Sequence, residues 1–98
     1  MTEAEINQIR LDGQFWRVLP GGNEKIIAFQ VSGLPKGIIA SLHCLKDSWQ
    51  FYVEAGDQQE AQSEFENEHA ALEGLREWLR HNAAYRNGQL GKGLNNRK

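Results

Sequence analysis

Four side chains in this sequence could ligate a soft metal ion: those of His43, Cys44, His69 and His81. Zinc sites usually show closely spaced ligand pairs such as CxxC or HxxxH, and neither spacing occurs here. His43 and Cys44 are consecutive on a predicted strand and so point to opposite faces, whereas His69 and His81 lie about 120° apart around a predicted helix. We therefore expect neither a metal site nor a cofactor.

Catalytic residues do not form a recognisable motif either. Cys44 is the single cysteine, so it cannot form an internal disulfide, and we interpret it as a small core residue. The serines lie outside any nucleophile-elbow motif, and Gly21-Gly22 is a tight turn with no following helix that would bind phosphate. We therefore expect a protein without enzymatic activity.

The charges are distributed unevenly along the chain, although its formal net charge is only −2. Residues 54–77 carry many carboxylates against the single base Arg76, whereas residues 78–98 carry bases and no acid. Such carboxylates are usually solvated, but an acidic edge can also dock a partner. The candidate contact residues within this segment are Glu60, Glu64 and Glu66.

A second candidate interface is the face of the predicted sheet that points away from the predicted helix. Alternation along the strands places Ile26, Ile39, Leu45 and Tyr52 there, which makes this face more apolar than one that contacts only water. Either the N-terminal segment covers it, or it binds a protein partner or a second copy of the chain.

The aromatic residues add one more candidate. Phe15 and Trp16 are consecutive on a predicted strand, so one of these rings must point away from the main core. Large aromatic side chains often dominate the binding energy of an interface. The candidate protein-binding residues on the strands are therefore Trp16, Ile39 and Tyr52.

Nucleic acid is the alternative partner. The bases near the C-terminus, together with Tyr52 and His43 on an open sheet face, resemble the combination of charge and stacking that single-strand binders use. A net charge of −2 and the acidic segment argue against it. The residues that would carry this function are Arg86, Lys92, Arg97 and Lys98. An acidic inhibitor of a nucleic-acid-binding protein is a further alternative.

The elements that would position these residues include one clear amphipathic helix, predicted over residues 67–82. Asn67 is a favoured N-cap residue, and Gly74 lies in the middle, either as tolerated slack or because another backbone approaches it closely. At 100° per residue the apolar side chains gather on one side, as expected of a helix that covers a sheet. These side chains are Ala71, Leu72, Leu75, Trp78 and Leu79.

From residue 14 onward the hydrophobic pattern has a period of two, which predicts strands over residues 14–19, 24–32, 38–45 and 48–54. A fifth strand over residues 58–65 would form an edge, with Ala61, Ser63 and Phe65 pointing inward. Short connections favour an antiparallel meander. The side chains predicted to lie under the helix are Ile27, Phe29, Val31, Ala40, Leu42, Cys44, Trp49, Phe51 and Val53.

The first thirteen residues fit two local structures. Thr2 and Glu5 have the spacing of a capping box, which favours a short helix, with Gly13 as the left-handed residue just past its end. Asp12-Gly13 is also a strong hairpin signal, which would instead pair the residues before and after it as strands. We favour the helix.

Together these patterns predict an α+β fold, an antiparallel meander of four or five strands packed against one C-terminal amphipathic helix, with a short N-terminal helix. Residues 1–86 would form one domain and residues 87–98 a basic, disordered tail. The sequence has no apolar run near the roughly 18 residues that span a membrane and no signal-peptide pattern, so we expect a cytoplasmic protein. Its expected function is that of a small interaction or regulatory module that binds a protein.

Overall fold

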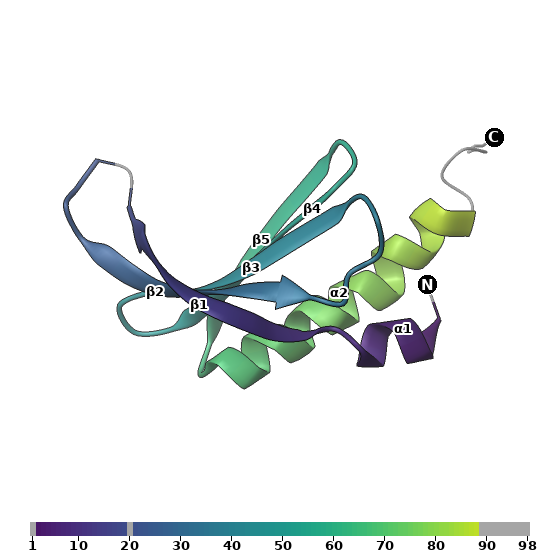
Figure 1. The fold of residues 1–98 in the computed structure, drawn as a ribbon, viewed down its shortest axis with the longest axis horizontal. Coiled ribbons are helices and arrows are strands. Elements are labelled where there is room, and N and C mark those ends of the chain that lie inside the picture. The colour runs from purple at the N-terminus through teal and green to yellow at the C-terminus, as the bar shows by residue number, and fades with distance from the viewer. Residues whose placement is uncertain (1, 20, 89–98) are drawn as a thin grey trace.

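The computed structural model describes residues 2–19 and 21–88 and confirms the α+β fold. Five antiparallel strands follow one another as a meander in the order β1-β2-β3-β4-β5, and the long helix α2 follows β5 (Figure 1). The elements are α1 (Glu3–Asn7), β1 (Arg10–Val18), β2 (Lys25–Ser32), β3 (Ile38–Cys44), β4 (Trp49–Ala55), β5 (Gln58–Phe65) and α2 (Glu68–Gly88).

The core lies between the sheet and α2, as the alternation of the strands predicts. The pairs Phe29–Leu42 and Leu42–Phe51 place these three side chains on the sheet face that contacts the helix. Leu75 and Leu79 of α2 are fully buried against this face. Burial of apolar surface between the two layers therefore holds α2 on the sheet.

The start of α2 is as predicted, but its end is not. The Asn67 side-chain oxygen accepts a hydrogen bond from the Ala70 amide at 2.7 Å, so Asn67 is the N-cap residue. The Asn82 side chain donates to the Trp78 carbonyl at 2.8 Å, one turn back along the helix, and the helix continues to Gly88. The helix therefore includes the predicted residues and extends past Asn82.

The glycine at position 74 is required by a side chain of the core and not by a neighbouring backbone. A Cβ atom added at Gly74 would lie 2.5 Å from the Cζ atom of Phe65 and 3.5 Å from the Cε2 atom of Phe51. The close approach is therefore that of an aromatic side chain. The helix accepts the intrinsic cost of glycine at this position because the Phe65 ring occupies the space that a larger residue would need.

The N-terminal segment forms a shorter helix than predicted, and neither local interpretation is fully correct. The capping box of Thr2 and Glu5 is present, but α1 ends at Asn7, and Asp12-Gly13 lies inside β1 at a register shift between Leu11 and Gln14. Asp12-Gly13, which resembles a hairpin turn in the sequence, therefore forms a β-bulge within one strand.

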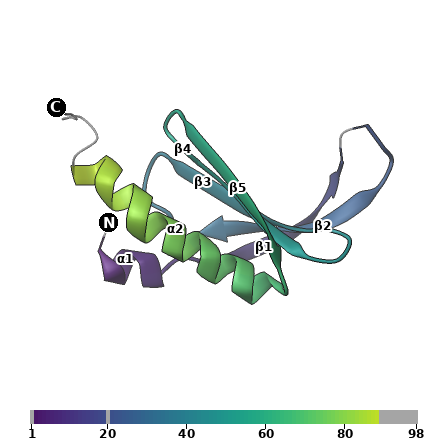
Figure 2. The same cartoon turned by 180° about the vertical axis from the view of Figure 1, so that it is seen from behind.

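The position of α1 shows which face of the sheet the N-terminal segment covers. Ile6 and Ile9 are buried, the Arg80 guanidinium forms an ion pair with Glu3 at 2.9 Å, and Arg76 donates a hydrogen bond to the Ile9 carbonyl. α1 therefore packs beside α2, on the same side of the sheet (Figure 2). The interpretation in which the N-terminal segment covers the opposite face was wrong.

The fifth strand is present, but its predicted faces were partly wrong. Ala61 pairs with Tyr52 on the face away from α2, whereas Phe65 pairs with Trp49 on the helix side. Between them Glu64 has a positive φ of 73° and the register shifts by one residue. This bulge reverses the alternation, so Ala61 and Phe65 lie on opposite faces.

Within the part of the chain that the structure describes, no helix is both long and apolar enough to cross a bilayer.

Candidate functional site

The open face of the sheet, defined here as the face opposite α2, carries the candidate site. The pairs Ala28–His43 and Ser41–Tyr52 place these four side chains on it, in agreement with the predicted alternation. Both helices lie on the other side of the sheet, and across residues 2–19 and 21–88 no helix covers this face (Figure 2).

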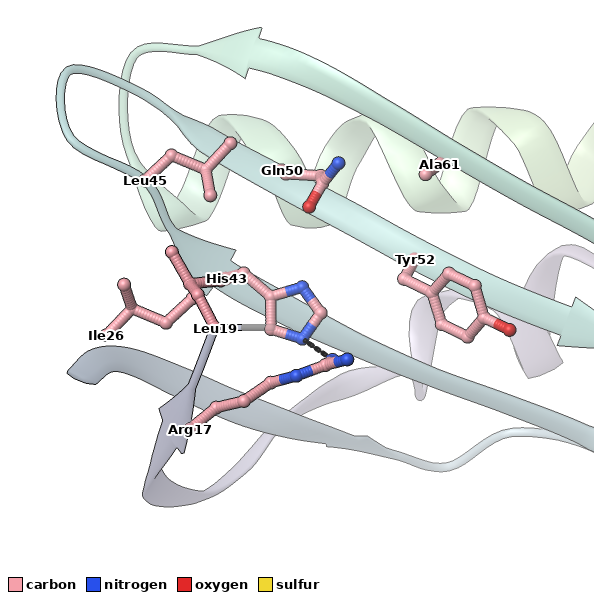
Figure 3. A pocket seen from close by; sticks show the side chains of 8 residues that line it. All are labelled: Arg17, Leu19, Ile26, His43, Leu45, Gln50, Tyr52 and Ala61. Atoms are coloured by element: carbon pink, nitrogen blue, oxygen red, sulfur yellow. Dashed lines mark hydrogen bonds between the residues drawn. The ribbon is translucent and has the colours of Figure 1, made fainter. Parts of the chain in front are cut away.

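A cavity of about 360 Å³ lies on the open face, and its lining includes residues from all five strands (Figure 3). Its polar lining comes from Arg17, His43, Gln50 and Tyr52. Its apolar lining includes the side chains of Leu19, Ile26 and Leu45. A few convergent polar groups within an apolar lining are typical of a recognition site.

His43 forms the floor of this cavity. It is only 4 % exposed, and its Nε2 atom lies 3.1 Å from Nη1 of Arg17 and 3.2 Å from Oγ of Ser41. An arginine guanidinium can only donate hydrogen bonds, so Nε2 accepts and the imidazole is neutral. Burial lowers the pKa of His43, and the positive charge of Arg17 lowers it further.

Arg17 reaches His43 across an intervening strand. Arg17 lies on β1 opposite Ile26, whereas His43 lies on β3 opposite the fully buried Ala28. The long side chain of Arg17 reaches from β1 across β2 to the imidazole on β3 (Figure 3). The neutral histidine thereby fixes the direction in which the guanidinium points.

This pair predicts a pH dependence of stability. When the pH falls from about 7.5 to 5.5, the unfolded chain gains a proton at the ordinary histidine pKa, whereas folded His43 resists protonation because its pKa is lowered. The stabilisation is therefore present at neutral pH and decreases toward acid. Urea unfolding at both pH values should show a fall in the midpoint that is smaller in His43→Gln and unchanged in the exposed control His69→Gln. An equal fall in all three proteins would contradict this assignment.

The other end of the open face is acidic. The Tyr52 hydroxyl donates a hydrogen bond to a Glu54 carboxylate oxygen at 3.2 Å, and the Gln59 amide donates to the same oxygen at 2.9 Å. Burial and the Glu54 carboxylate raise the pKa of Tyr52, so its hydroxyl remains a donor. Tyr52 thus lies between a cationic and an anionic end of the face.

The residues predicted for protein binding do not form a single patch. Ile39 is 64 % exposed, and it shares the open face with Tyr52. Trp16 is 61 % exposed but pairs with Ile27 on the helix side, where the β1–β2 hairpin extends beyond α2 (Figure 1). The ring that points away from the main core is therefore Phe15, which pairs with Ala28.

The acidic residues lie apart from the open face. Glu60 pairs with Val53 on the helix side of the edge strand β5, Glu64 lies in the bulge, and Glu66 is exposed just after the strand. Of the bases proposed for nucleic-acid binding, Arg86 belongs to α2, whereas Lys92, Arg97 and Lys98 lie outside the described residues. The structure therefore brings together Ile39 and Tyr52 only.

Comparisons with protein-family models, curated proteins and solved structures gave no match to this chain. The candidate site accordingly rests on its own geometry. Residues 2–19 and 21–88 contain no group of three histidine, cysteine, aspartate or glutamate side chains that could hold a metal ion.

Sequence reasoning did not identify Arg17 and His43 as a pair. Alternation alone places His43 on the open face, but its burial depends on a side chain two strands away. Alternation within single strands gives no signal that would join these two residues.

Proposed function

We propose that this protein is a non-enzymatic protein-binding module whose partner docks on the open face of the sheet. The observation that carries the proposal is the placement of both helices on the opposite side, which leaves Ile39, Tyr52 and the cavity uncovered. A single exposed apolar side chain such as Ile39 is common on protein surfaces, but a cavity on the same face that combines apolar and polar lining residues is typical of a recognition surface.

The acidic residues of β5 are weaker candidates for partner binding than the open face. Glu60 and Glu64 lie in the edge strand β5 and Glu66 follows it, and carboxylates at an edge discourage pairing with another chain. A bulge in an edge strand serves the same purpose. We therefore assign these residues to protection of the β5 edge and assign partner binding to the open face.

Substitution of Ile39 by serine tests the proposal. Because Ile39 is 64 % exposed, the change should leave folding intact while weakening partner binding about tenfold, which is the effect of losing a contact worth about 1.4 kcal/mol. The measurement is affinity capture from a nuclease-treated lysate, with the bound proteins of wild type and variants compared by quantitative mass spectrometry. Tyr52→Ala should reduce the same bound protein.

The matched control is the triple charge reversal Glu60→Lys, Glu64→Lys and Glu66→Lys, which should retain that bound protein. If the triple variant loses the partner while Ile39→Ser and Tyr52→Ala retain it, the acidic edge is the binding surface and the proposal is wrong. Bound material that disappears on nuclease treatment would instead support nucleic-acid binding.

A further inference from the structure

The cavity on the open face contains the cation Arg17, to which none of the described residues contributes a carboxylate within ion-pair distance. In the part of the chain that the structure describes, the ion pairs of arginine join Glu73 to Arg76, and Glu3 and Glu77 to Arg80, all of them around α2. None involves Arg17, whose guanidinium donates a hydrogen bond to the neutral imidazole of His43.

The geometry leaves most of the Arg17 guanidinium available. An arginine side chain presents five N–H donors in a planar fork, and the Nη1 contact to His43 uses one of them. Because His43 is buried and held in β3, it fixes the orientation of the fork along the cavity (Figure 3). A fork positioned in this way suits a planar carboxylate, which can accept two parallel hydrogen bonds.

The apolar residues that line the cavity restrict the chemistry of the ligand further. Leu19, Ile26 and Leu45 offer apolar contact beside the guanidinium, so a ligand that fits must join an anionic group to an apolar one. Glu54 lies on the same face beyond Tyr52. A face that carries the cation Arg17 at one end and the carboxylate of Glu54 at the other favours a ligand with one isolated negative charge over the repeated phosphates of a nucleic acid.

We propose that Arg17 binds a carboxylate of the protein partner, supplied by an aspartate or glutamate that stands next to a large apolar residue in the docked segment. This inference rests on the proposed function. The apolar neighbour enters the space between Leu19, Ile26 and Leu45, while the carboxylate accepts hydrogen bonds from the guanidinium.

A phage-displayed library of random peptides tests this specificity without knowledge of the natural partner. Peptides selected on the wild-type protein should be enriched in an acidic residue beside leucine, isoleucine or phenylalanine. Their affinity should fall about ten- to a hundredfold in Arg17→Gln, the range expected for one charge-assisted hydrogen-bonded pair. Lys25→Gln is the matched control, because it removes the same charge from an exposed site on β2, and it should retain the affinity.

The possible failures are distinguishable. Selected peptides that lose affinity in Ile39→Ser but show no acidic enrichment, or that are unaffected by Arg17→Gln, would overturn the carboxylate assignment and leave the proposed function standing. Failure to select any peptide that is sensitive to Ile39→Ser would overturn both. Binding of a fluorescent oligothymidylate that Arg17→Gln abolishes would overturn the carboxylate assignment in favour of phosphate.

Discussion

Replacement of Phe51 by alanine should lower the free energy of unfolding by about 3–5 kcal/mol, the range for deleting a buried aromatic ring. Phe51 is fully buried on β4, and its ring centroid lies 5.9 Å from that of Phe65. The surrounding layer includes fully buried Leu42 and Leu75, which cannot fill the resulting space without moving the sheet or the helix. Urea unfolding followed by circular dichroism measures the loss.

Such a loss would be a large fraction of the total stability, which for a domain of this size is about 5–15 kcal/mol. Tyr52→Ala is the matched control, because Tyr52 is the next residue on the same strand but faces the opposite side and is only half-buried. It should cost about 1 kcal/mol, a typical value for a point substitution. Equal losses in the two variants would show that the core does not lie between β4 and α2.

Replacement of Gly33 by alanine should cost about 2–4 kcal/mol, from a strained backbone together with overpacking. Gly33 has a φ of 84°, and an added Cβ would overlap the Gln8 carbonyl oxygen and lie 2.9 Å from its carbonyl carbon. These are backbone atoms of the connection between α1 and β1. They cannot move without displacing Ile9, which is fully buried.

The variant Gly37→Ala measures the cost of backbone strain without the cost of overpacking. Gly37 has a similar φ of 90°, but a Cβ added there meets nothing within 4 Å. It should therefore show only the conformational cost, about 1–2 kcal/mol. If Gly33→Ala destabilises the protein no more than Gly37→Ala, the close contact between the end of β2 and the α1–β1 connection is absent.

The sheet and α2 could be predicted because their patterns extend over many residues. Alternation places Phe29, Leu42 and Phe51 on one face, and their cross-strand pairing confirms it. The bulges could not be predicted in this way, because one extra residue near Glu64 changes the alternation without changing the composition. The face of Ala61 was therefore assigned incorrectly.

The candidate site was only partly predictable for a related reason. Ile39 and Tyr52 follow from alternation along single strands, but the contact between Arg17 and His43 joins β1 to β3 across β2. It depends on how three neighbouring strands are aligned and twisted, and the pattern of any one strand does not contain this information.

The claim that the open face binds the partner is tested most directly by nuclear magnetic resonance of the labelled protein during titration with the captured partner. Methyl signals of Leu19, Ile39 and Leu45 should shift, whereas the backbone amides of Glu60 and Glu64 should not. Shifts confined to those two amides, with the three methyl signals unchanged, would contradict the account and assign the interface to the acidic edge.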